Sequence, residues 1–179
     1  MKATGIVRRI DDLGRIVIPK EIRRTLRIRE GDPLEIFTDR EGKVILKKYS
    51  PIGELGSLAG IYADSLSKTL DCTVCITDTD QVIAAAGNGK KELQEMLLSA
   101  ELAEVFQERK TVLKKSSDAE FVAITKDRSE YSEEIISVIL SEGDIAGGVI
   151  FLQKNEKKHF GEMEKKFAAG ANFFSISPK

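Results

Sequence analysis

The sequence of 179 residues has few of the residues that enzymes and metalloproteins most often use at their sites. It contains one histidine, His159, two cysteines, Cys72 and Cys75, and no tryptophan. One histidine is too few for a multi-histidine metal site, and two cysteines cannot build a disulfide framework. Scarce cysteine fits the reducing conditions of the cytoplasm, which is where we expect the protein to act.

Long hydrophobic runs are also missing from the sequence. The longest apolar stretch, Ile145 to Leu152, is far shorter than the ~20 residues that a membrane-spanning helix needs. The N-terminal residues lack the apolar core of a secretory signal. We therefore expect no membrane partner.

The overall charge balance conceals a segregation of charge along the chain. The 28 Lys and Arg residues nearly cancel the 29 Asp and Glu residues, which leaves a formal net charge of −1. Residues 1–50 hold 13 basic and 8 acidic side chains, a net of +5, whereas residues 51–179 hold 15 and 21, a net of −6. This contrast predicts a basic domain over 1–50, a linker over 51–55 that runs into a helix, and an acidic domain over 56–179.

The basic domain has the pattern of four short strands with one helix in the middle. Apolar alternation and turn residues predict a first hairpin around Asp11–Gly14, and Pro19 precedes a short helix. The turn at Asp39–Gly42 predicts a second hairpin. The expected strands are residues 5–10, 15–18, 34–37 and 44–46, and the expected helix is residues 20–26.

Projection of that helix at about 100° per residue gathers its cations on one side. Lys20, Arg23, Arg24 and Arg27 share one arc, opposite a stripe of Ile22 and Leu26. A solvated charged face is the ordinary interpretation of such an arc. However, residues 1–29 hold nine basic and three acidic side chains, and so dense a positive charge repels itself unless a polyanion neutralises it. The pattern therefore favours a nucleic acid as partner.

The small size of the basic domain predicts an oligomer. Fifty residues of short strands rarely bury enough apolar surface to offset their ordering entropy, so domains of this size usually need a metal, a disulfide or a partner. The sequence offers no metal site or disulfide here. A two-fold dimer would also present two basic surfaces to a duplex.

Residues 3–48 resemble the AbrB-type DNA-binding domain of bacterial transition-state regulators, through the run from Thr4 to Leu26 and the motif Gly31-Asp-Pro-Leu-Glu35. The resemblance implies a dimeric swapped-hairpin β-barrel that binds double-stranded DNA through Arg8, Arg15, Arg23 and Arg24. Lys20, Arg27 and Arg9 complete our candidate set from the charge pattern. The assignment of Arg8 depends on the resemblance, because alternation places Ile6, Arg8 and Ile10 on the same side of a strand.

The acidic domain begins with a predicted helix. Ser50 suits the N-cap position and Pro51 the first helical position. An apolar stripe follows, flanked by small residues that allow close approach of another helix. This stripe either packs against its own domain or pairs two chains. Its members are Leu55, Leu58, Ile61, Tyr62, Leu66 and Leu70, and the small residues are Gly56, Ala59, Gly60 and Ala63.

The rest of the acidic domain alternates strands and helices, which makes the whole chain an α+β protein. Hairpins are expected at 74–84 and 135–152, with a helical region at 91–109 interrupted at Ser99 and a strand at 121–124. A last helix with Phe160, Met163, Phe167, Ala171 and Phe174 on one side should cover, with the first helix, one face of an antiparallel sheet. This order, and the turn Glu142-Gly-Asp-Ile-Ala-Gly-Gly-Val149, resemble a GAF domain, a small α/β fold that binds small molecules or dimerises.

The combination of both domains is similar to a family of sporulation transcription factors from endospore-forming bacteria. This resemblance implies a regulator that is both activator and repressor in the developing forespore, and a homotetramer built through both domains. AbrB-type heads also occur in antitoxins, which bind a toxin through a flexible tail, so an antitoxin is the second hypothesis. A small-molecule sensor is the third, with a ligand of the C-terminal domain left unidentified.

Several motifs are better explained by structure than by chemistry. Cys72-Thr-Val-Cys75 lies at a strand start, where residues three apart point to opposite faces, so both thiols are expected in the core. Gly87-Asn-Gly-Lys-Lys91 departs from a phosphate-binding loop. His159 is expected at the surface. The pairs Asp78/Asp80 and Glu133/Glu134 are expected in turns or exposed positions without a nucleophile. We therefore predict no enzyme, no metal and no cofactor.

Overall fold

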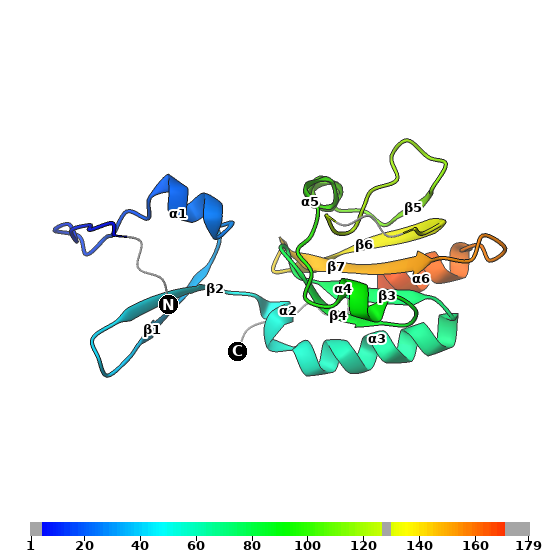
Figure 1. The fold of residues 1–179 in the computed structure, drawn as a ribbon, viewed down its shortest axis with the longest axis horizontal. Helices are drawn as coiled ribbons and strands as arrows, with labels where there is room; N and C mark the ends of the chain where they lie inside the picture. The colour runs from blue at the N-terminus through cyan, green and yellow to red at the C-terminus, as the bar shows by residue number, and fades with distance from the viewer. Residues whose placement is uncertain (1–4, 127–129, 171–179) are drawn as a thin grey trace. The chain divides into compact units, whose positions relative to one another are not determined.

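The computed structural model describes residues 5–126 and 130–170, and the chain forms two compact units. The N-terminal unit ends at Tyr49 and the C-terminal unit begins at Ser50 (Figure 1).

The N-terminal unit contains one short helix followed by a β-hairpin. In the hairpin, Leu34 lies opposite Lys48 and Thr38 lies opposite Val44. The Asp39 carboxylate closes the turn, because its Oδ1 accepts hydrogen bonds from the backbone N–H groups of Glu41 and Lys43, each at 2.9 Å. The second predicted hairpin and the predicted helix are thus confirmed. The elements are α1 (Lys20–Thr25), β1 (Leu34–Thr38) and β2 (Val44–Lys48).

The first predicted hairpin forms its turn but not its strands. The Gly14 N–H donates to the Asp11 carbonyl at 3.0 Å, and the Asp11 N–H donates to the Arg15 carbonyl at 3.1 Å. Residues 5–10 and 15–18, however, are not in strands, which corrects the sequence prediction. The physical reason is that these segments find no pairing partner within the single chain, and Val7 and Val17 are 86% and 73% exposed.

The C-terminal unit is a five-stranded antiparallel sheet with helices on both faces (Figure 1). The strands lie in the order β4-β3-β7-β6-β5. The hairpins predicted around residues 74–84 and 135–152 are confirmed as β3–β4 and β6–β7. The elements are α2 (Pro51–Glu54), α3 (Gly56–Leu70), β3 (Thr73–Thr77), β4 (Val82–Ala86), α4 (Lys90–Leu93), α5 (Ala100–Gln107), β5 (Val112–Lys115), β6 (Glu133–Ser141), β7 (Asp144–Gln153) and α6 (Glu162–Gly170).

Each face of this sheet has its own hydrophobic core. Ala59 and Ala63 of α3 and Ala168 of α6 pack with the first core, so the two terminal helices cover one face as predicted. Leu102 and Phe106 of α5 belong to the second core, together with Ile124 from the segment that precedes β6. Alternation along β6 sends Ile135 to the first core and Ile136 to the second.

Two glycines of β7 allow the second face to pack closely. A Cβ at Gly147 would lie 1.9 Å from the Thr77 carbonyl oxygen of β3, and a Cβ at Gly148 would lie 2.6 Å from the Phe106 ring of α5. Both distances are too short for real atoms, so β3 and α5 can approach β7 here only because these positions lack side chains.

Several predicted details are wrong. The first helix is divided at Leu55 into α2 and α3, and its buried side carries the small residues, so Leu58 and Ile61 are 52% and 68% exposed. Residues 121–124 form an irregular segment instead of a strand, whereas β5 was not predicted. In α6, Met163 and Phe167 are exposed. The predicted face also included Ala171 and Phe174, which lie outside the described residues.

Candidate functional site

The cations of the N-terminal unit are mostly at its surface. Arg23, Arg27 and Lys48 are half-buried, whereas the other described cations are exposed. The projection therefore placed Arg24 correctly on an exposed face but overstated the exposure of Arg23. Leu26, expected on the inner stripe, is 58% exposed, and α1 has no buried residue. We call the predicted set the cationic surface: Arg8, Arg9, Arg15, Lys20, Arg23, Arg24 and Arg27.

Asp11 orients Arg15 within the first turn. Its Oδ2 accepts a hydrogen bond from Arg15 Nε at 2.7 Å, and its Oδ1 accepts from the backbone N–H groups of Leu13 and Arg15. The Arg15 backbone N–H and then its side chain lower the pKa of Asp11, so the carboxylate stays ionised. An acidic residue in a basic surface thus acts as an anchor for a cation, a role that the charge count did not reveal.

Lys48 ties the end of α1 to the second hairpin. The helix ends where Arg27 takes a left-handed conformation with φ of 54°, and the Ile28 N–H then donates to the Arg23 carbonyl at 2.8 Å. Lys48 Nζ lies 2.9 Å from Asp32 Oδ2 and donates to the Arg27 carbonyl at 3.3 Å. This contact holds the helix that carries Arg23 and Arg24 against β2.

The start of the C-terminal unit is bonded to the turn between β3 and β4. Ser50 caps α2 as predicted, since its Oγ accepts from the Gly53 N–H at 3.0 Å. The same hydroxyl donates to Asp78 Oδ2 at 3.0 Å. Asp78 Oδ1 in turn accepts from the Asp80 and Gln81 N–H groups at 2.7 and 2.8 Å. The residue next to the N-terminal unit is therefore fixed to the sheet.

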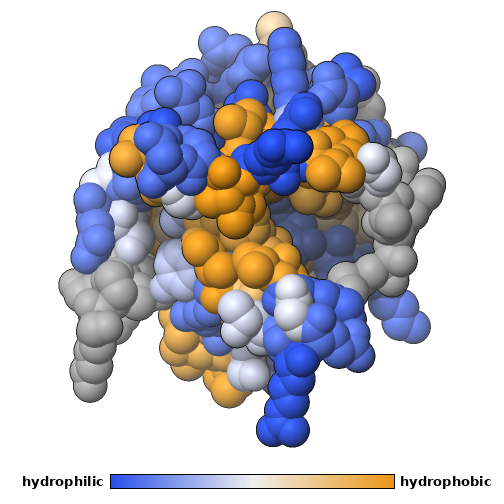
Figure 2. Space-filling model, turned by 90° about the vertical axis from the view of Figure 1, so that its left-hand side faces the viewer, coloured by the Kyte–Doolittle hydropathy of each residue, from blue (hydrophilic) through white to orange (hydrophobic). Residues whose placement is uncertain are grey.

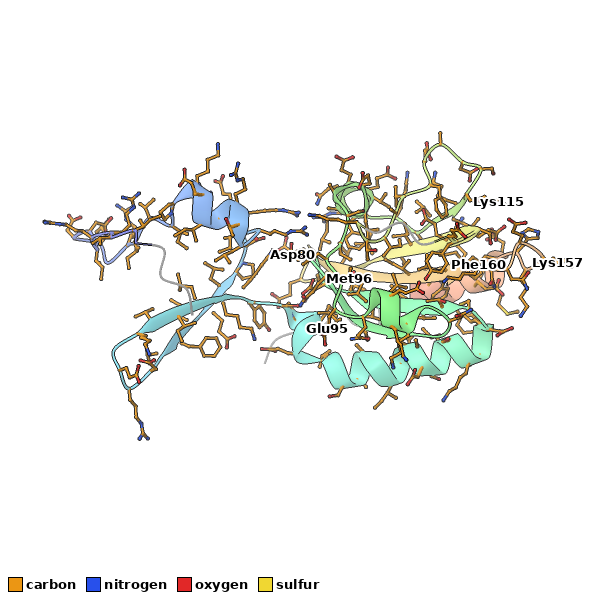
Figure 3. The ribbon with its side chains drawn as sticks, viewed as in Figure 1. Asp80, Glu95, Met96, Lys115, Lys157 and Phe160 are labelled. Carbon is orange, nitrogen blue, oxygen red and sulfur yellow. The ribbon has the colours of Figure 1, made fainter. Side chains whose placement is uncertain are left out.

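Further hydrogen bonds connect the turn between β3 and β4 with the second core. The Leu98 N–H donates to the Asp80 carbonyl at 2.8 Å, and Leu98 also forms a bridge with Thr125. The Met96 carbonyl accepts from the Val82 N–H, and Met96 lies with Asp80 at one end of the sheet (Figure 3). A continuous series of hydrogen bonds thus connects Ser50 with the segment 121–125.

Glu133 and Glu134, expected at exposed positions, are both buried on β6, which corrects the sequence prediction. The burial arises because β6 is covered on both faces. Glu133 faces the terminal helices, where its Oε1 lies 2.6 Å from His159 Nδ1 and its Oε2 accepts from the Phe160 N–H at 2.7 Å. Burial opposes ionisation, but Phe160, His159 and Lys115 outweigh it and lower the pKa of Glu133. Lys115 and Phe160 lie at the same end of the sheet (Figure 3).

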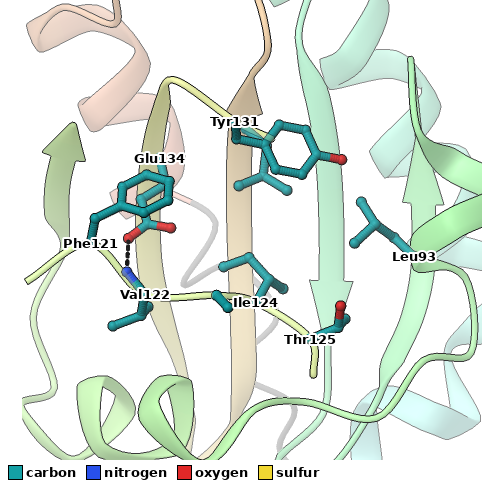
Figure 4. A pocket seen from close by; sticks show the side chains of 9 residues that line it. Leu93, Phe121, Val122, Ile124, Thr125, Tyr131 and Glu134 are labelled. Carbon is teal, nitrogen blue, oxygen red and sulfur yellow. Dashed lines mark hydrogen bonds between the residues drawn. The ribbon is translucent and has the colours of Figure 1, made fainter. Parts of the chain in front are cut away.

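Glu134 faces the other way, into a small pocket (Figure 4). Its Oε1 accepts from the Val122 N–H at 3.0 Å. Burial raises the pKa of Glu134 to about 7, although Val122 and Lys114 act in the opposite direction. The pocket has a volume of about 10 Å³, the space of roughly one water molecule. Its lining residues are Leu93, Phe121, Val122, Ala123, Ile124, Thr125, Tyr131, Glu134 and Leu152.

The other predicted motifs are structural. Cys72 and Cys75 are free and buried in opposite cores, as expected, and burial raises the pKa of each thiol to about 12. Asp78 lies in a turn, as expected, and it is buried because its side chain organises that turn. His159 is at the surface as predicted, with a side chain 63% exposed. In residues 5–126 and 130–170, no cluster of three His, Cys, Asp or Glu could hold a metal, and no helix is long and apolar enough to cross a membrane.

The C-terminal unit has the fold of a GAF domain. The GAF domain of a phosphoenolpyruvate-protein phosphotransferase from Acinetobacter aligns with a TM-score of 0.57 at 15% identity, over 72% of this chain and 81% of that one. At such identity the likeness shows the fold alone. It agrees with the GAF-like fold that the order of elements predicted.

The N-terminal unit is of the AbrB type. Residues 7–54 match the family described as the antidote-toxin recognition protein MazE, a bacterial antitoxin. A segment of 51 residues is 67% identical to transition state regulatory protein AbrB of Bacillus subtilis (strain 168), which covers 28% of this chain and 52% of that protein. The match thus spans about half the length of this relative.

A head of this type joined to a GAF-like body defines a transcription regulator. The chain belongs to the stage V sporulation protein T family. Residues 54–175 match the family described as stage V sporulation protein T C-terminal, transcription factor. Over 170 residues the chain is 52% identical to stage V sporulation protein T of Bacillus subtilis (strain 168), covering 93% of this chain and 92% of that protein. The family consists of transcription factors and indicates neither an enzyme nor a cofactor.

Proposed function

We propose that the chain regulates sporulation genes by binding double-stranded DNA through the cationic surface. The observation that carries this proposal is the segregation of charge, +5 in residues 1–50 against −6 in the rest, in a member of a transcription-factor family. Arginine suits the task because its planar fork can bond phosphates or guanine edges in a bidentate manner. In line with the family resemblance, the regulator acts as activator and repressor in the cytoplasm of the forespore.

The N-terminal unit binds DNA as a dimer. Twelve of the 17 exposed large hydrophobic side chains of the described residues lie in this unit, and Pro19 is the one buried residue in the described part of the unit. Figure 2, viewed from the left-hand side of Figure 1, shows such apolar patches between hydrophilic side chains. Apolar surface of this extent on so small a unit supports burial against a second copy, as in a swapped-hairpin barrel.

The decisive variant is Arg23→Ala/Arg24→Ala in the full chain. It should lower the affinity for duplex DNA at least 100-fold, because two copies in a dimer remove four cations, while the oligomeric state stays unchanged. Arg40→Ala/Lys91→Ala is the matched control, since it removes two exposed cations outside the cationic surface. Fluorescence anisotropy and light scattering measure both properties. Normal DNA binding by the first variant would refute the assignment of the site.

The C-terminal unit is proposed as the regulatory and assembly module, which completes a tetramer. The hydrogen-bond series from Ser50 to residues 121–125 supports a regulatory role, because it joins the pocket segment to the residue that follows the N-terminal unit. The pocket around Glu134, once enlarged, is the proposed site for sensing a small molecule.

An antitoxin function is the alternative, favoured by the match of residues 7–54 to the MazE family. Antitoxins of this type hold their toxin with a flexible tail, whereas most of the C-terminal unit of this chain is folded around two cores. Co-purification with a small nuclease would support the antitoxin. Purification of the chain alone, with DNA affinity intact, would support the regulator.

A further inference from the structure

A buried carboxylate in the C-terminal unit has one oxygen that lacks a hydrogen-bond partner among the described residues. Glu134 is 0% exposed, and its Oε1 accepts from the Val122 N–H, but Oε2 is buried and unpaired. An unpaired buried polar atom is destabilising, and more so when it is charged. The arrangement therefore calls for a donor that the described part of the chain does not supply.

The surroundings of Oε2 restrict what that donor can be. The pocket walls are mainly apolar, with Phe121, Leu93 and Leu152 among them (Figure 4). Lys114 lies directly across the ladder from Glu134, but its ammonium group pairs with Glu120. A negative carboxylate repels anions, and one carboxylate within apolar walls provides too few oxygen ligands for a hydrated metal ion. A positively charged donor attached to an apolar group satisfies both features of the site.

We infer that this pocket binds a small apolar molecule that carries a protonated amine, with the ammonium group donating to Oε2 of Glu134. Oε1 keeps its bond to the Val122 N–H, and the alkyl or aryl part packs against Phe121 and Leu93. The inference rests on the proposed sensing function of the C-terminal unit and names the ligand class of that function.

The pocket must enlarge to hold such a ligand, because its present volume of about 10 Å³ fits one water molecule. The segment that closes it is irregular, and the hydrogen bonds that attach it to its neighbours include those from the Val122 N–H to Glu134 and from the Ser99 N–H to the Ile124 carbonyl at 3.0 Å. An outward shift of residues 123–125, with Val122 still bonded to Glu134, would also move Thr125, which bridges Leu98 in the series that leads to Ser50. Ligand binding would thus change the hydrogen-bond series that ends at the linker.

The ionisation of Glu134 provides a direct readout. Its pKa of about 7 means that the free carboxyl is partly protonated at neutral pH. An ammonium ligand binds the ionised form, so it should lower this pKa, and its affinity should increase as the pH rises through 7. A neutral donor such as an alcohol lacks the positive charge and should lower this pKa less.

The experiment titrates the full chain with isoamylamine and benzylamine and follows the carboxyl carbon of Glu134 by ¹³C NMR. Isoamyl alcohol and isovalerate are the neutral and anionic counterparts of similar size. We expect both amines to bind and to lower the pKa of Glu134, the alcohol to bind at least tenfold more weakly, and isovalerate not to bind. Absence of binding by either amine at millimolar concentration would overturn the inference.

Glu134→Gln tests the contact itself, because the amide oxygen can still accept from Val122 while the charge is lost. Amine affinity should fall at least tenfold in this variant and stay unchanged in Glu104→Gln, a control at an exposed position of α5. Equal affinity in Glu134→Gln would overturn the inference. If Glu134→Gln fails to fold, the comparison of amine, alcohol and carboxylate on the unmodified chain still decides.

DNA affinity measured on the same samples separates the two proposals. Intact DNA binding without amine binding refutes only the ligand class. Binding of isovalerate in place of the amines keeps a sensing function but refutes the amine. If the unmodified chain does not bind DNA, the proposed function itself is refuted.

Discussion

At the scale of single residues, Asp11 gives the sharpest test of the cationic surface. Removal of an acid from a DNA-binding surface normally increases affinity, because it reduces repulsion of the phosphates. Asp11, however, holds Arg15 through a 2.7 Å hydrogen bond and closes the turn with two more. We therefore predict that Asp11→Asn weakens DNA binding about three- to tenfold, measured by anisotropy at constant salt.

The neighbouring Asp12→Asn is the matched control, since Asp12 is also exposed and carries the same charge. It should leave the affinity unchanged or increase it slightly. If Asp11→Asn and Asp12→Asn strengthened binding equally, Asp11 would contribute charge alone and Arg15 would not depend on it.

The raised pKa of Glu134 predicts an unusual dependence of the free energy of unfolding on pH. Burial raises its pKa from 4.5 to about 7, so the folded chain holds this proton more tightly than the unfolded chain does. Its contribution is fully present below pH 4.5 and is lost as the pH rises through 7, by about 3 kcal/mol at most. Urea unfolding at pH 5 to 8 should show this decline in the unmodified chain and not in Glu134→Gln.

The opposite sign holds for Glu133, which separates the two carboxyls experimentally. Its pKa is lowered, so its contribution is present at neutral pH and is lost as the pH falls below the ordinary range of a glutamate. The free energy of unfolding of Glu104→Gln should equal that of the unmodified chain at every pH. A decline between pH 5 and 8 that persists in Glu134→Gln would place its origin elsewhere.

At the scale of elements, the N-cap residue Ser50 attaches the linker to the turn between β3 and β4. Ser50 accepts from the Gly53 N–H and donates to Asp78, both at 3.0 Å. Ser50→Ala should lower the free energy of unfolding by about 1 to 2 kcal/mol and speed hydrogen exchange at Gly53. Ser57→Ala, at an exposed position near the start of α3, should change neither. Equal protection of Gly53 in both variants would mean that the cap does not hold the linker.

The sequence predicts correctly those elements that are marked by their own residues, through turns, caps and apolar runs. The Ser50 cap, the turn at Asp39 and the hairpins β3–β4 and β6–β7 all carry turn or capping residues next to apolar runs. Local signals failed where tertiary contacts decide. The strand β5 is a short edge strand with two lysines, so it lacks an apolar run. Residues 121–124 are apolar because they cover the second core, and they do not form a strand.

The site shows the same division. Charge and periodicity predict the cationic arc on the helix, and the resemblance adds the arginines of the first hairpin; this assignment stays a prediction. The anchoring of Arg15 by Asp11 and the pairing of Lys48 with Asp32 depend on turn geometry and on packing. The sequence predicts an exposed position for Glu134, whereas the structure buries it, since a sequence does not show that both faces of β6 are covered.

At the scale of the whole molecule, the apolar surface of the N-terminal unit predicts an obligate oligomer. Val7 is 86% exposed in the single chain, and at an ordinary surface position Val7→Glu would change little. If a second copy covers Val7, the variant should dissociate the N-terminal units and abolish DNA binding. Light scattering measures the first effect and anisotropy the second.

Leu97→Glu serves as the control for this substitution, because Leu97 is a 46% exposed leucine of the C-terminal unit. It should leave DNA binding intact. A Val7→Glu chain with the original molar mass and DNA affinity would show that Val7 faces solvent in the functional protein.

The charge segregation also assigns a use to the acidic body. A net charge of −6 over residues 51–179 repels the phosphates of a duplex, which leaves the basic head as the part that faces DNA. We propose that this attraction and repulsion together orient the regulator on its target.

The measurement that tests this account most directly is the salt dependence of DNA affinity. For the unmodified chain, the logarithm of the association constant should fall with the logarithm of salt concentration with a slope of roughly −5 or steeper, because a dimer neutralises several phosphates. Arg23→Ala/Arg24→Ala should make the slope shallower by about 3 to 4, whereas Arg40→Ala/Lys91→Ala should preserve it. A slope near zero for the unmodified chain, or equal slopes for both variants, would contradict DNA binding through the cationic surface.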